Sequence, residues 1–320
     1  MVFAKIIGTS GYLPQKVLTN KDLESMVDTT HDWIVERTGI YKRHIITNGE
    51  STYSMALAAG KEALKNAGLK ATDLDLIIVA TVTPDKIMPC AACILQEKLG
   101  AKHIMAFDLS AACAGFVCAL ATAQQFIESG NVVNALVVGA EAMSTVLDWT
   151  DRNTCVLFGD GAGAVVLTAN PDPGIHISKL QSDGNYGNIL QVNSNLPGYK
   201  NDNASPYIQM AGREVFKFAV NNLGDLAFKT LATVNMKESD IDWLIPHQAN
   251  IRIIQAIAKK LNYSMDKVIV TVDRHGNTSS ASIPLALHEG ISSGKIKSGQ
   301  KLLLEAFGGG IIWGSIILTL

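Results

Sequence analysis

Apolar and polar positions along the chain form strand-like and helix-like patterns in alternation. Residues 1–14 hold an alternating apolar run that soon meets glycine and proline, which predicts a first strand. A helical stretch begins at Ser51 and ends at Gly68. The apolar run within residues 73–84 then predicts a buried strand and a turn. Strands that alternate with helices are typical of α/β folds, so we expect that fold class.

Three segments of the first part of the chain recur, in the same order, in the second part. The offsets between matched positions are 167, 166 and 151 (240 − 73, 301 − 135 and 315 − 164), so the first part is longer before its last strand. We interpret this as two halves of one design, 1–170 and 171–320, although buried strands rich in Val, Ile and Leu resemble one another in any case. The matched pairs are 72–83 with 239–250, 135–141 with 301–307, and 164–168 with 315–319.

The composition indicates a large buried core. Of the 320 residues, 48% are hydrophobic and 18% are charged, which argues against disorder, and the length allows about two domains. The net charge of −2 provides no basic field for nucleic acid or an anionic membrane. No apolar run approaches the ~18 residues that span a bilayer. Five cysteines without framework spacing suit a reducing compartment, so we expect a cytoplasmic protein.

Cys113 stands where a predicted buried strand meets a predicted apolar helix. Residues 103–107 form the short apolar run, and the segment from Cys113 to Phe126 has almost no polar face, as in a helix at the middle of a protein. The positive end of such a helix lowers the pKa of a thiol and favours the nucleophilic thiolate. A small buried hydrophobe is the equally supported alternative, since free cysteines are often buried.

Two polar side chains of the second half also stand at the ends of predicted elements. His247 follows a buried strand that ends at Pro246, because proline cannot extend a central ladder, and Asn250 is the predicted cap of the next helix. Asn277 lies in a glycine-containing turn. The offset between the halves places Asn277 beside the counterpart of Cys113, and ligand sites favour such junctions.

A Cys–His–Asn set has two chemical uses. In a papain-like hydrolase, histidine deprotonates cysteine and asparagine orients the ring, and the spacing from Cys113 to His247 fits that class. In a condensing enzyme, the cysteine carries an acyl group while histidine and asparagine donate hydrogen bonds to a developing enolate. The duplicated core, the lack of a Cys-Gly-Ser-Cys signature and the lack of paired cysteines favour the second use.

Five motifs, in order over essentially the whole chain, resemble those of the β-ketoacyl-acyl carrier protein synthase III family of the thiolase superfamily. They are DLSAACAGF (108–116), FGDGAGA (158–164), PHQANIRI (246–253), HGNTSSASIP (275–284) and FGGGIIWGS (307–315). The resemblance implies the thiolase fold, in which two pseudo-duplicated βαβαβαββ halves form a five-layer αβαβα sandwich, and it implies a homodimer.

The resemblance also implies the first condensation of dissociated (type II) fatty-acid synthesis, without cofactor or metal. An acyl-CoA, typically acetyl-CoA, acylates the cysteine, and the carbanion of decarboxylated malonyl-acyl carrier protein attacks the acyl group to give a 3-oxoacyl product. Asn277 fits this branch, because elongating synthases have a second histidine there. The acyl primer, loading from acyl carrier protein instead of CoA, and polyketide or signal-molecule synthesis stay open.

Residue roles follow from the same resemblance, motif by motif. Cys113 is the implied nucleophile, His247 and Asn277 are the implied decarboxylation pair, and the N–H groups of Cys113 and Gly309 form the implied oxyanion hole. For the substrate contacts and docking residues named next, the alternative to a binding role is an ordinary position in the core or on the solvated surface. The implied substrate contacts are Trp33, Arg37, Arg152, Phe307 and Met88, the last in a loop expected to cross the dimer. The implied docking residues for an acidic carrier protein are Gln248, Ala249, Asn250, Ile251 and Arg252, with Arg213 and Lys217 on another helix.

Overall fold

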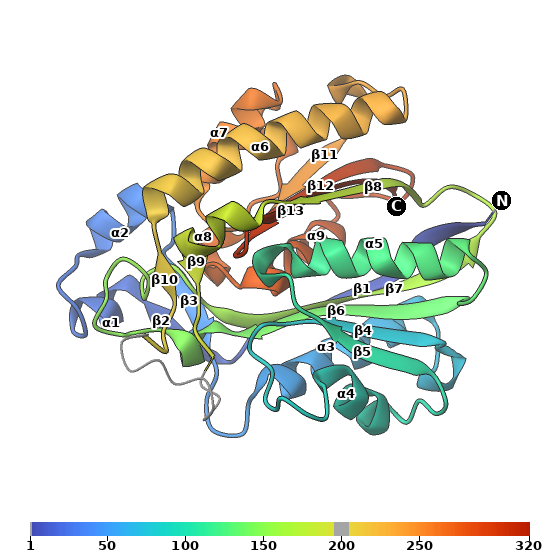
Figure 1. Ribbon diagram of the computed structural model, residues 1–320, viewed down its shortest axis with the longest axis horizontal. Coiled ribbons are helices and arrows are strands. Elements are labelled where there is room, and N and C mark those ends of the chain that lie inside the picture. Colours follow the sequence, from blue (N-terminus) through green and yellow to red (C-terminus); the bar gives the residue numbers. More distant parts are fainter. Residues whose placement is uncertain (1, 195–204) are drawn as a thin grey trace.

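Two large β-sheets lie one above the other in the computed structural model, which describes residues 2–194 and 205–320 (Figure 1). Both sheets mix parallel and antiparallel pairs, and their apolar strands are buried on both faces. The first sheet has the spatial order β1 (Phe3–Tyr12), β7 (Asp160–Asn170), β6 (Asn134–Ala142), β4 (Leu76–Ala80), β5 (Met105–Leu109). The second has the order β11 (Trp243–Pro246), β12 (Lys301–Gly308), β13 (Ile312–Thr319), β8 (Ile175–Ser182).

The two sheets repeat one topology. Along each sheet the first strand in the sequence is followed by the last, the last but one and the second. The third strand of the first sheet is β5, and the second sheet has at that place a single parallel bridge from Leu244 to Val268. The starts of β4 and β11 and those of β6 and β12 are separated by one and the same offset, 167 (243 − 76 and 301 − 134). The expected pseudo-duplicated halves of the thiolase fold are therefore present.

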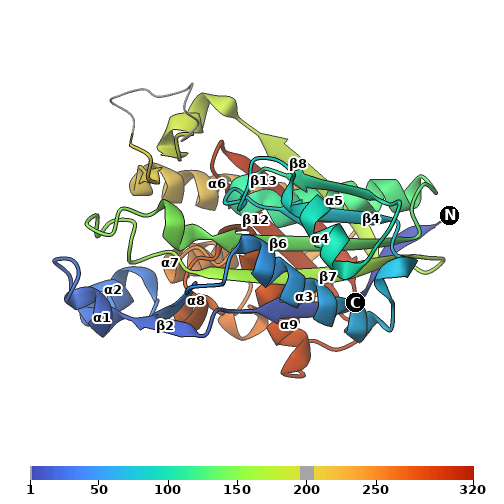
Figure 2. The ribbon, with the colours of Figure 1, turned by 90° about the horizontal axis from the view of Figure 1, so that it is seen from below.

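Helices form three further layers, between and outside the sheets (Figures 1 and 2). Alternation along the strands explains the layers: Leu76 and Ile78 pack in the central cluster with α5 and α9, whereas Ile77 packs on the outer side with α3 and α4. In the second sheet Leu302 faces the central helices and Leu303 faces α6 and α7. This is the expected αβαβα sandwich. The helices are α3 (Thr52–Ala67), α4 (Ala91–Leu99), α5 (Gly115–Glu128), α6 (Gly212–Thr233), α7 (Ile251–Lys260) and α9 (Ser282–Ser292).

Smaller elements gather at one end of the sandwich, on the left of Figure 1. They frame the end of the molecule at which β4, β5 and β11 finish. Buried Arg43 of the third strand joins some of them, since its guanidinium donates to the backbone oxygen of Leu18, to Oδ1 of Asn20 and to the backbone oxygen of Val156. The elements are β2 (Lys16–Thr19), α1 (Asn20–Glu24), α2 (His31–Thr38), β3 (Lys42–Ile45), β9 (Leu190–Gln191), β10 (Gln209–Met210) and α8 (Val272–His275).

Candidate active site

Cys113, His247 and Asn277 line one cavity of about 840 Å³, and all three side chains are buried. Cys113 lies in the 3₁₀ turn Ala112–Ala114 between β5 and α5, so the regular helix begins only at Gly115, slightly later than the sequence pattern suggested. His247 directly follows β11, as its neighbour Pro246 predicts. The cavity therefore brings together the three residues that the sequence singled out.

The turn that carries Cys113 has a counterpart in the second half. Ala112 (φ 46°) and Ser279 (φ 49°) both adopt the left-handed region, and the offset between the halves relates them (279 − 112 = 167). Left-handed conformations of residues other than glycine cost about 1–3 kcal/mol and cluster at functional sites. The 3₁₀ turn Ser279–Ala281 contacts the Cys113 turn, and Ser280 Oγ donates to the Ala80 oxygen at 2.9 Å. The two central helices, α5 and α9, thus begin next to each other at the cavity.

Glycine at 308 permits close approach of the strand end to the Cys113 turn. A Cβ atom at Gly308 would lie 2.7 Å from the Cys113 nitrogen and 2.8 Å from the Ala114 nitrogen. Gly309, the next residue, lines the cavity. The strand end β12 and the cysteine turn therefore form one wall of the site.

A hydrogen bond to Ser282 fixes the imidazole of His247. Nδ1 lies 2.6 Å from Ser282 Oγ, and the backbone N–H of Gln248 donates to the same oxygen at 3.4 Å. We assign the Ser282 hydroxyl proton to Nδ1, with Oγ accepting from the Gln248 N–H, and this tautomer leaves Nε2 as the protonated ring nitrogen. Burial lowers the pKa of His247 to about 3. The histidine is therefore a neutral hydrogen-bond donor at neutral pH.

Hydrogen bonds to neighbouring backbone groups fix both the backbone and the side chain of Asn277. Its backbone N–H donates to the Leu157 oxygen at 2.8 Å, and its backbone oxygen accepts from Gly159 at 3.0 Å. The side-chain Oδ1 accepts from the Ser279 backbone N–H at 2.9 Å. With the oxygen engaged in this way, the amide NH₂ is the group left to donate.

The expectation of a low pKa for Cys113 is wrong. The pKa of its thiol is raised to about 12, chiefly by burial and also by the charge of nearby Glu141, while the neighbouring Ser279 side chain acts in the opposite direction. A helix terminus stabilises a charged thiolate by only about 0.3–1 kcal/mol, which is a small effect on its pKa. Complete burial shifts a pKa by up to about 3–5 units and therefore outweighs it. The resting cysteine is therefore a thiol that must lose its proton when it reacts.

Phe307 and three residues of the expected CoA site have distinct positions. Phe307 lines the cavity and packs edge-to-face on His247, with ring centroids 5.5 Å apart. Trp33 lies outside the cavity and packs on the outer core, with the guanidinium carbons of Arg37 and Arg152 at 4.8 and 5.2 Å from its ring centroid. Arg152 also donates to the backbone oxygen of Asp28. The structure thus clusters the three expected CoA contacts around one indole ring.

Met88 does not line the cavity of its own chain. Its side chain is 81% exposed, whereas Thr83 and Pro84 of the same loop do line the cavity. Any contact of Met88 with an acyl group would have to involve another subunit.

The expected docking residues divide into buried and exposed groups. The expectation that Gln248 contacts the carrier protein is wrong. Gln248 is 1% exposed, and its Nε2 donates to the backbone oxygens of Pro246 and Ile269, so its side chain supports the site from within and does not reach the surface. Ala249 is buried as well and lines the cavity. Asn250 caps α7 by accepting from Arg252 N–H.

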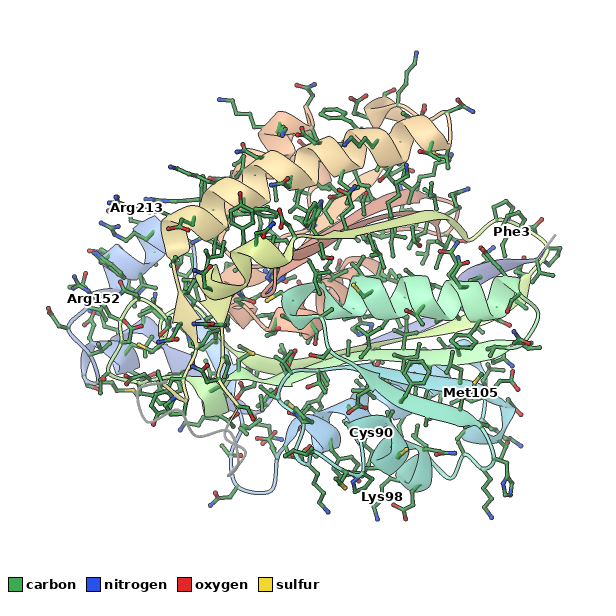
Figure 3. All side chains as sticks on the ribbon, viewed as in Figure 1. Phe3, Cys90, Lys98, Met105, Arg152 and Arg213 are labelled. Carbon is green, nitrogen blue, oxygen red and sulfur yellow. The ribbon has the colours of Figure 1, made fainter. Side chains whose placement is uncertain are left out.

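The remaining docking candidates lie at or near the surface at the same end of the molecule. Ile251 is half-buried beside Gly39, and exposed Arg252 lies 3.6 Å from Glu36. Arg213 and Lys217 are exposed on α6, and neither makes an ion pair within the described residues. Figure 3 shows Arg213 on the same side of the molecule as Arg152.

Three polar residues of the site were not singled out from the sequence. Ser279 and Ser282 are placed in the motif around Asn277, where a run of serines indicates a turn but not which hydroxyl enters the site. Glu141 is fully buried at the end of β6, beside the cysteine. Its only signal in the sequence is one charge at the end of the apolar run 135–140.

Comparison with known proteins agrees with this geometry. The family described as 3-oxoacyl-[acyl-carrier-protein (ACP)] synthase III matches residues 107–184, and its C-terminal counterpart matches residues 231–320. The β-ketoacyl-[acyl-carrier-protein] synthase III of Thioalkalivibrio sulfidiphilus is 53% identical over 320 residues, which covers 99% of each chain. The chain belongs to the β-ketoacyl-acyl carrier protein synthase III family.

Solved structures of synthase III enzymes share the whole fold. The 3-oxoacyl-[acyl-carrier-protein] synthase III of Aquifex aeolicus is 48% identical, with a TM-score of 0.94 over 99% of this chain and 100% of that one. The priming β-ketosynthase of the R1128 polyketide pathway is 36% identical, with a TM-score of 0.95 over 99% and 96%. The chain is accordingly an acyltransferase of the condensing type, with the thiolase fold.

Neither a metal site nor a membrane-spanning helix is present among the described residues. Within residues 2–194 and 205–320, no group of three or more His, Cys, Asp or Glu side chains is arranged to hold a metal ion. None of the helices in these ranges is long and apolar enough to cross a membrane.

Proposed function

We propose that this synthase III condenses an acyl-CoA primer with malonyl-acyl carrier protein through an acyl group on Cys113. The observation that carries the proposal is the shared cavity, in which a buried thiol faces two neutral donors, His247 and Asn277. The thiol attacks the acyl carbon, CoA leaves, and carbon dioxide leaves the malonyl group. The resulting carbanion attacks the acyl-enzyme, which yields 3-oxoacyl-acyl carrier protein and restores the thiol.

His247 and Asn277 have the properties that the decarboxylation step requires. Loss of carbon dioxide places a negative charge on the thioester oxygen, and donors fixed in a low-dielectric site stabilise such charge. The tautomer set by Ser282 provides Nε2–H, and the engaged Oδ1 of Asn277 leaves its NH₂ to donate. A neutral histidine avoids a cation in the site, so it does not neutralise the malonyl carboxylate whose loss drives the reaction.

The backbone N–H groups of Cys113 and Gly309 form the proposed oxyanion hole. Both residues line the cavity, and the close approach at Gly308 brings their backbones together. A donor at such a position is worth about 2.7–4 kcal/mol of transition-state stabilisation in enzymes where one has been removed.

Trp33, Arg37 and Arg152 form the proposed site for the nucleotide end of CoA. A half-buried indole with two guanidinium groups on it offers a stacking surface for adenine and positive charge for phosphate. The cavity, lined mainly by apolar side chains, would then hold the pantetheine arm and the acyl group.

Arg213, Lys217 and Arg252 form the proposed docking surface for an acidic carrier protein. All three are exposed, and Phe216, between the first two in sequence, lines the cavity. Cations at that place would steer the carrier toward the cavity although the net charge of the chain is −2.

A homodimer is proposed through the free edge of the first sheet. The edge strand β5 has a partner on one side only, and its residues Met105, Ala106 and Phe107 are exposed or half-buried (Figure 3 labels Met105). An apolar unpaired edge is a template for a strand of a second copy. Such a dimer would give Met88 its role in closing the partner's acyl site, and flexible methionine would admit longer or branched primers. Strict acetyl preference among acetyl-, butyryl- and branched acyl-CoA would count against that role of Met88.

The chain is also proposed to divide into functional halves near residue 170 and to work in the cytoplasm. The first half, 1–170, would hold the nucleophile and the CoA contacts. The second, 171–320, would hold the His–Asn pair and the docking surface. The absence of paired cysteine spacing in the sequence supports a reducing compartment.

The deciding experiment is the intact mass of the protein after incubation with acetyl-CoA, with the modified residue mapped. We expect one acetyl group on Cys113, none in Cys113→Ala, and a normal adduct in Cys118→Ala, which removes a buried thiol of α5 outside the cavity lining. Malonyl decarboxylation should survive in Cys113→Ala because the two donors remain. Acetyl-CoA consumed without an adduct would indicate a hydrolase instead, and acetyl-CoA left intact would indicate another primer.

A further inference from the structure

Glu141 is a fully buried carboxyl group beside the nucleophile, and the mechanism above gives it no task. Its Oε2 accepts from Thr83 Oγ1 at 2.7 Å, from Val82 N–H at 3.1 Å and from Thr81 Oγ1 at 3.2 Å. Its Oε1 faces the other way and accepts from Ser279 Oγ at 3.2 Å. Burial raises the pKa of Glu141, while these donors counteract that effect. The group can therefore take up a proton more readily than an exposed glutamate.

Ser279 connects this carboxyl to the cysteine. The Ser279 hydroxyl donates to Glu141 Oε1, and the turn that carries it contacts the Cys113 turn, so its oxygen is within reach of the thiol proton. Its backbone is fixed in the left-handed region, with its N–H bonded to Asn277 Oδ1. Ser279 and Cys113 also line the same cavity. A continuous path thus runs from the thiol through one hydroxyl to a carboxyl group.

The histidine is poorly placed to accept the proton of the thiol. In the tautomer assigned above, Nδ1 accepts from the Ser282 hydroxyl and Nε2 carries the ring proton. Protonation of the ring would put an unpaired cation at a buried position, since no acidic side chain is bonded to His247 within the described residues. The proton must leave the thiol when it attacks the thioester, so another acceptor is required.

We propose that Ser279 and Glu141 relay the proton of Cys113 during acylation, with Ser279 in contact with the reacting sulfur and Glu141 as a positioning residue behind it. As the bond from Sγ to the acyl carbon forms and CoA thiolate leaves, the Sγ proton passes to Ser279 Oγ. The hydroxyl proton of Ser279 passes at the same time to Glu141 Oε1. Return of one proton along the path to the departing CoA thiolate restores the resting state, so no other reactant is consumed.

The proposal rests on the acyl-Cys113 intermediate of the proposed function. It assigns the two half-reactions to different residues of the cavity. The relay serves acylation, whereas His247 and Asn277 serve decarboxylation. A merely structural Glu141 would tie β6 to the segment Thr81–Thr83, and its loss would weaken both reactions together.

Ser279→Ala is the sharpest variant, because it cuts the path and keeps the backbone bond to Asn277. Alanine occurs naturally at the equivalent left-handed position, 112, so the variant should fold. The matched control is Ser10→Ala, which also removes a buried serine hydroxyl, one that donates to the Ala59 oxygen away from the cavity. Glu141→Gln is the second variant, and thermal melting checks the folding of all three.

The measurement is the single-turnover rate of acetylation by acetyl-CoA from pH 5 to pH 9, with malonyl decarboxylation measured in a Cys113→Ala background. General-base contributions are about 10²–10⁴-fold, so we expect acetylation to fall at least about 10²-fold in Ser279→Ala. Decarboxylation should stay within about twofold of its parent. In Glu141→Gln the acetylation rate should rise steadily with pH, as for an unassisted thiol.

Three results would overturn the relay. They are an acetylation rate in Ser279→Ala within about twofold of the wild type, equal losses of acetylation and decarboxylation, or a Glu141→Gln pH profile that matches the wild type. Failure of the wild-type protein to form an adduct at Cys113 would instead contradict the function proposed above. The rate at which iodoacetamide alkylates Cys113 measures the same proton path without acyl-CoA, and it should also fall in Ser279→Ala.

Discussion

Ser282 Oγ lies 2.6 Å from Nδ1 of His247, and in the assigned tautomer its hydroxyl donates to Nδ1 and leaves the ring proton on Nε2. The serine belongs to α9, a central helix, whereas the histidine follows a strand of the second sheet. A donor aimed at an enolate thus depends on a helix that makes no contact with substrate in the proposed mechanism.

Ser282→Ala should slow malonyl decarboxylation about tenfold and leave acetylation of Cys113 within about twofold. The reason is that loss of a hydrogen bond of about 1–1.5 kcal/mol frees the ring to rotate and to change tautomer. Ser282→Thr, which keeps the hydroxyl, should recover part of the rate. An equal fall of both half-reactions would show that Ser282 acts on the fold of the site and not on the ring.

The buried neutral His247 predicts a pH dependence of stability. Its pKa is about 3 in the folded protein and about 6.5 in an unfolded chain. Below pH 6.5 the unfolded state binds a proton that the folded state does not, so stability falls as the pH drops from 6.5 toward 3. At about pH 5 this group should cost about 2 kcal/mol relative to pH 7.

Urea unfolding of wild-type protein and His247→Gln at pH 7 and pH 5 checks this sign. The variant should lose about 2 kcal/mol less than the wild type between the two pH values. His103→Asn, which changes an exposed histidine, is the control. A wild type and a His247→Gln variant with equal losses would contradict the assignment.

Gly308→Ala should slow acetylation on the order of 10²-fold while Gly184→Ala leaves it unchanged. The added methyl group at 308 would meet the Cys113 and Ala114 nitrogens within 2.8 Å, and the turn that carries the thiol would have to move. Displacements of about 1 Å in such sites cost on the order of 10²-fold in rate. A Cβ atom at Gly184 would meet nothing within 4 Å. The rate at which the acetyl adduct forms on each variant provides the measurement, and a Gly308→Ala enzyme that reacts at the wild-type rate would refute the close-approach argument.

Arg252→Glu should weaken turnover with malonyl-acyl carrier protein about tenfold and spare acetylation by acetyl-CoA. A reversed charge at an exposed docking position lowers the association rate, and the effect should shrink as salt is added. Lys65→Glu, on α3 at the opposite outer layer, tests for a general effect of charge reversal. Equal losses in the two half-reactions would place the effect elsewhere than docking.

Much of the fold follows from local patterns. The turn before α7 is an instance: Pro246 ends β11, His247 follows it, and Asn250 caps the helix, as the residue types predict. The recurrence of similar segments at a nearly constant offset indicated the relation between the halves, because each half must bury equivalent strands on both faces.

What the sequence could not provide is the balance of opposed effects in the assembled site. The helix terminus near Cys113 predicts a low pKa, but burial among other elements outweighs it. Gln248 stands in a docking motif, yet the loop folds its amide inward to satisfy buried backbone groups. In the sequence Glu141 is one charged residue at the end of an apolar run. Its hydrogen bond with Ser279 forms only when the two halves pack together.

The hydrogen bond from Ser280 to the Ala80 oxygen joins the two halves at corresponding positions of their repeated structure. The offset between the halves equates Ser280 with Cys113 and Ala80 with His247, since both differences are the same (280 − 113 and 247 − 80). The second half thus has a serine at the nucleophile's place, and the first half has an alanine at the histidine's place. The contact between Ser280 and Ala80 thus joins the two halves at the positions that correspond to Cys113 and His247. In the proposed mechanism each half lacks residues that the other provides, so co-expressed fragments should regain activity only as a pair.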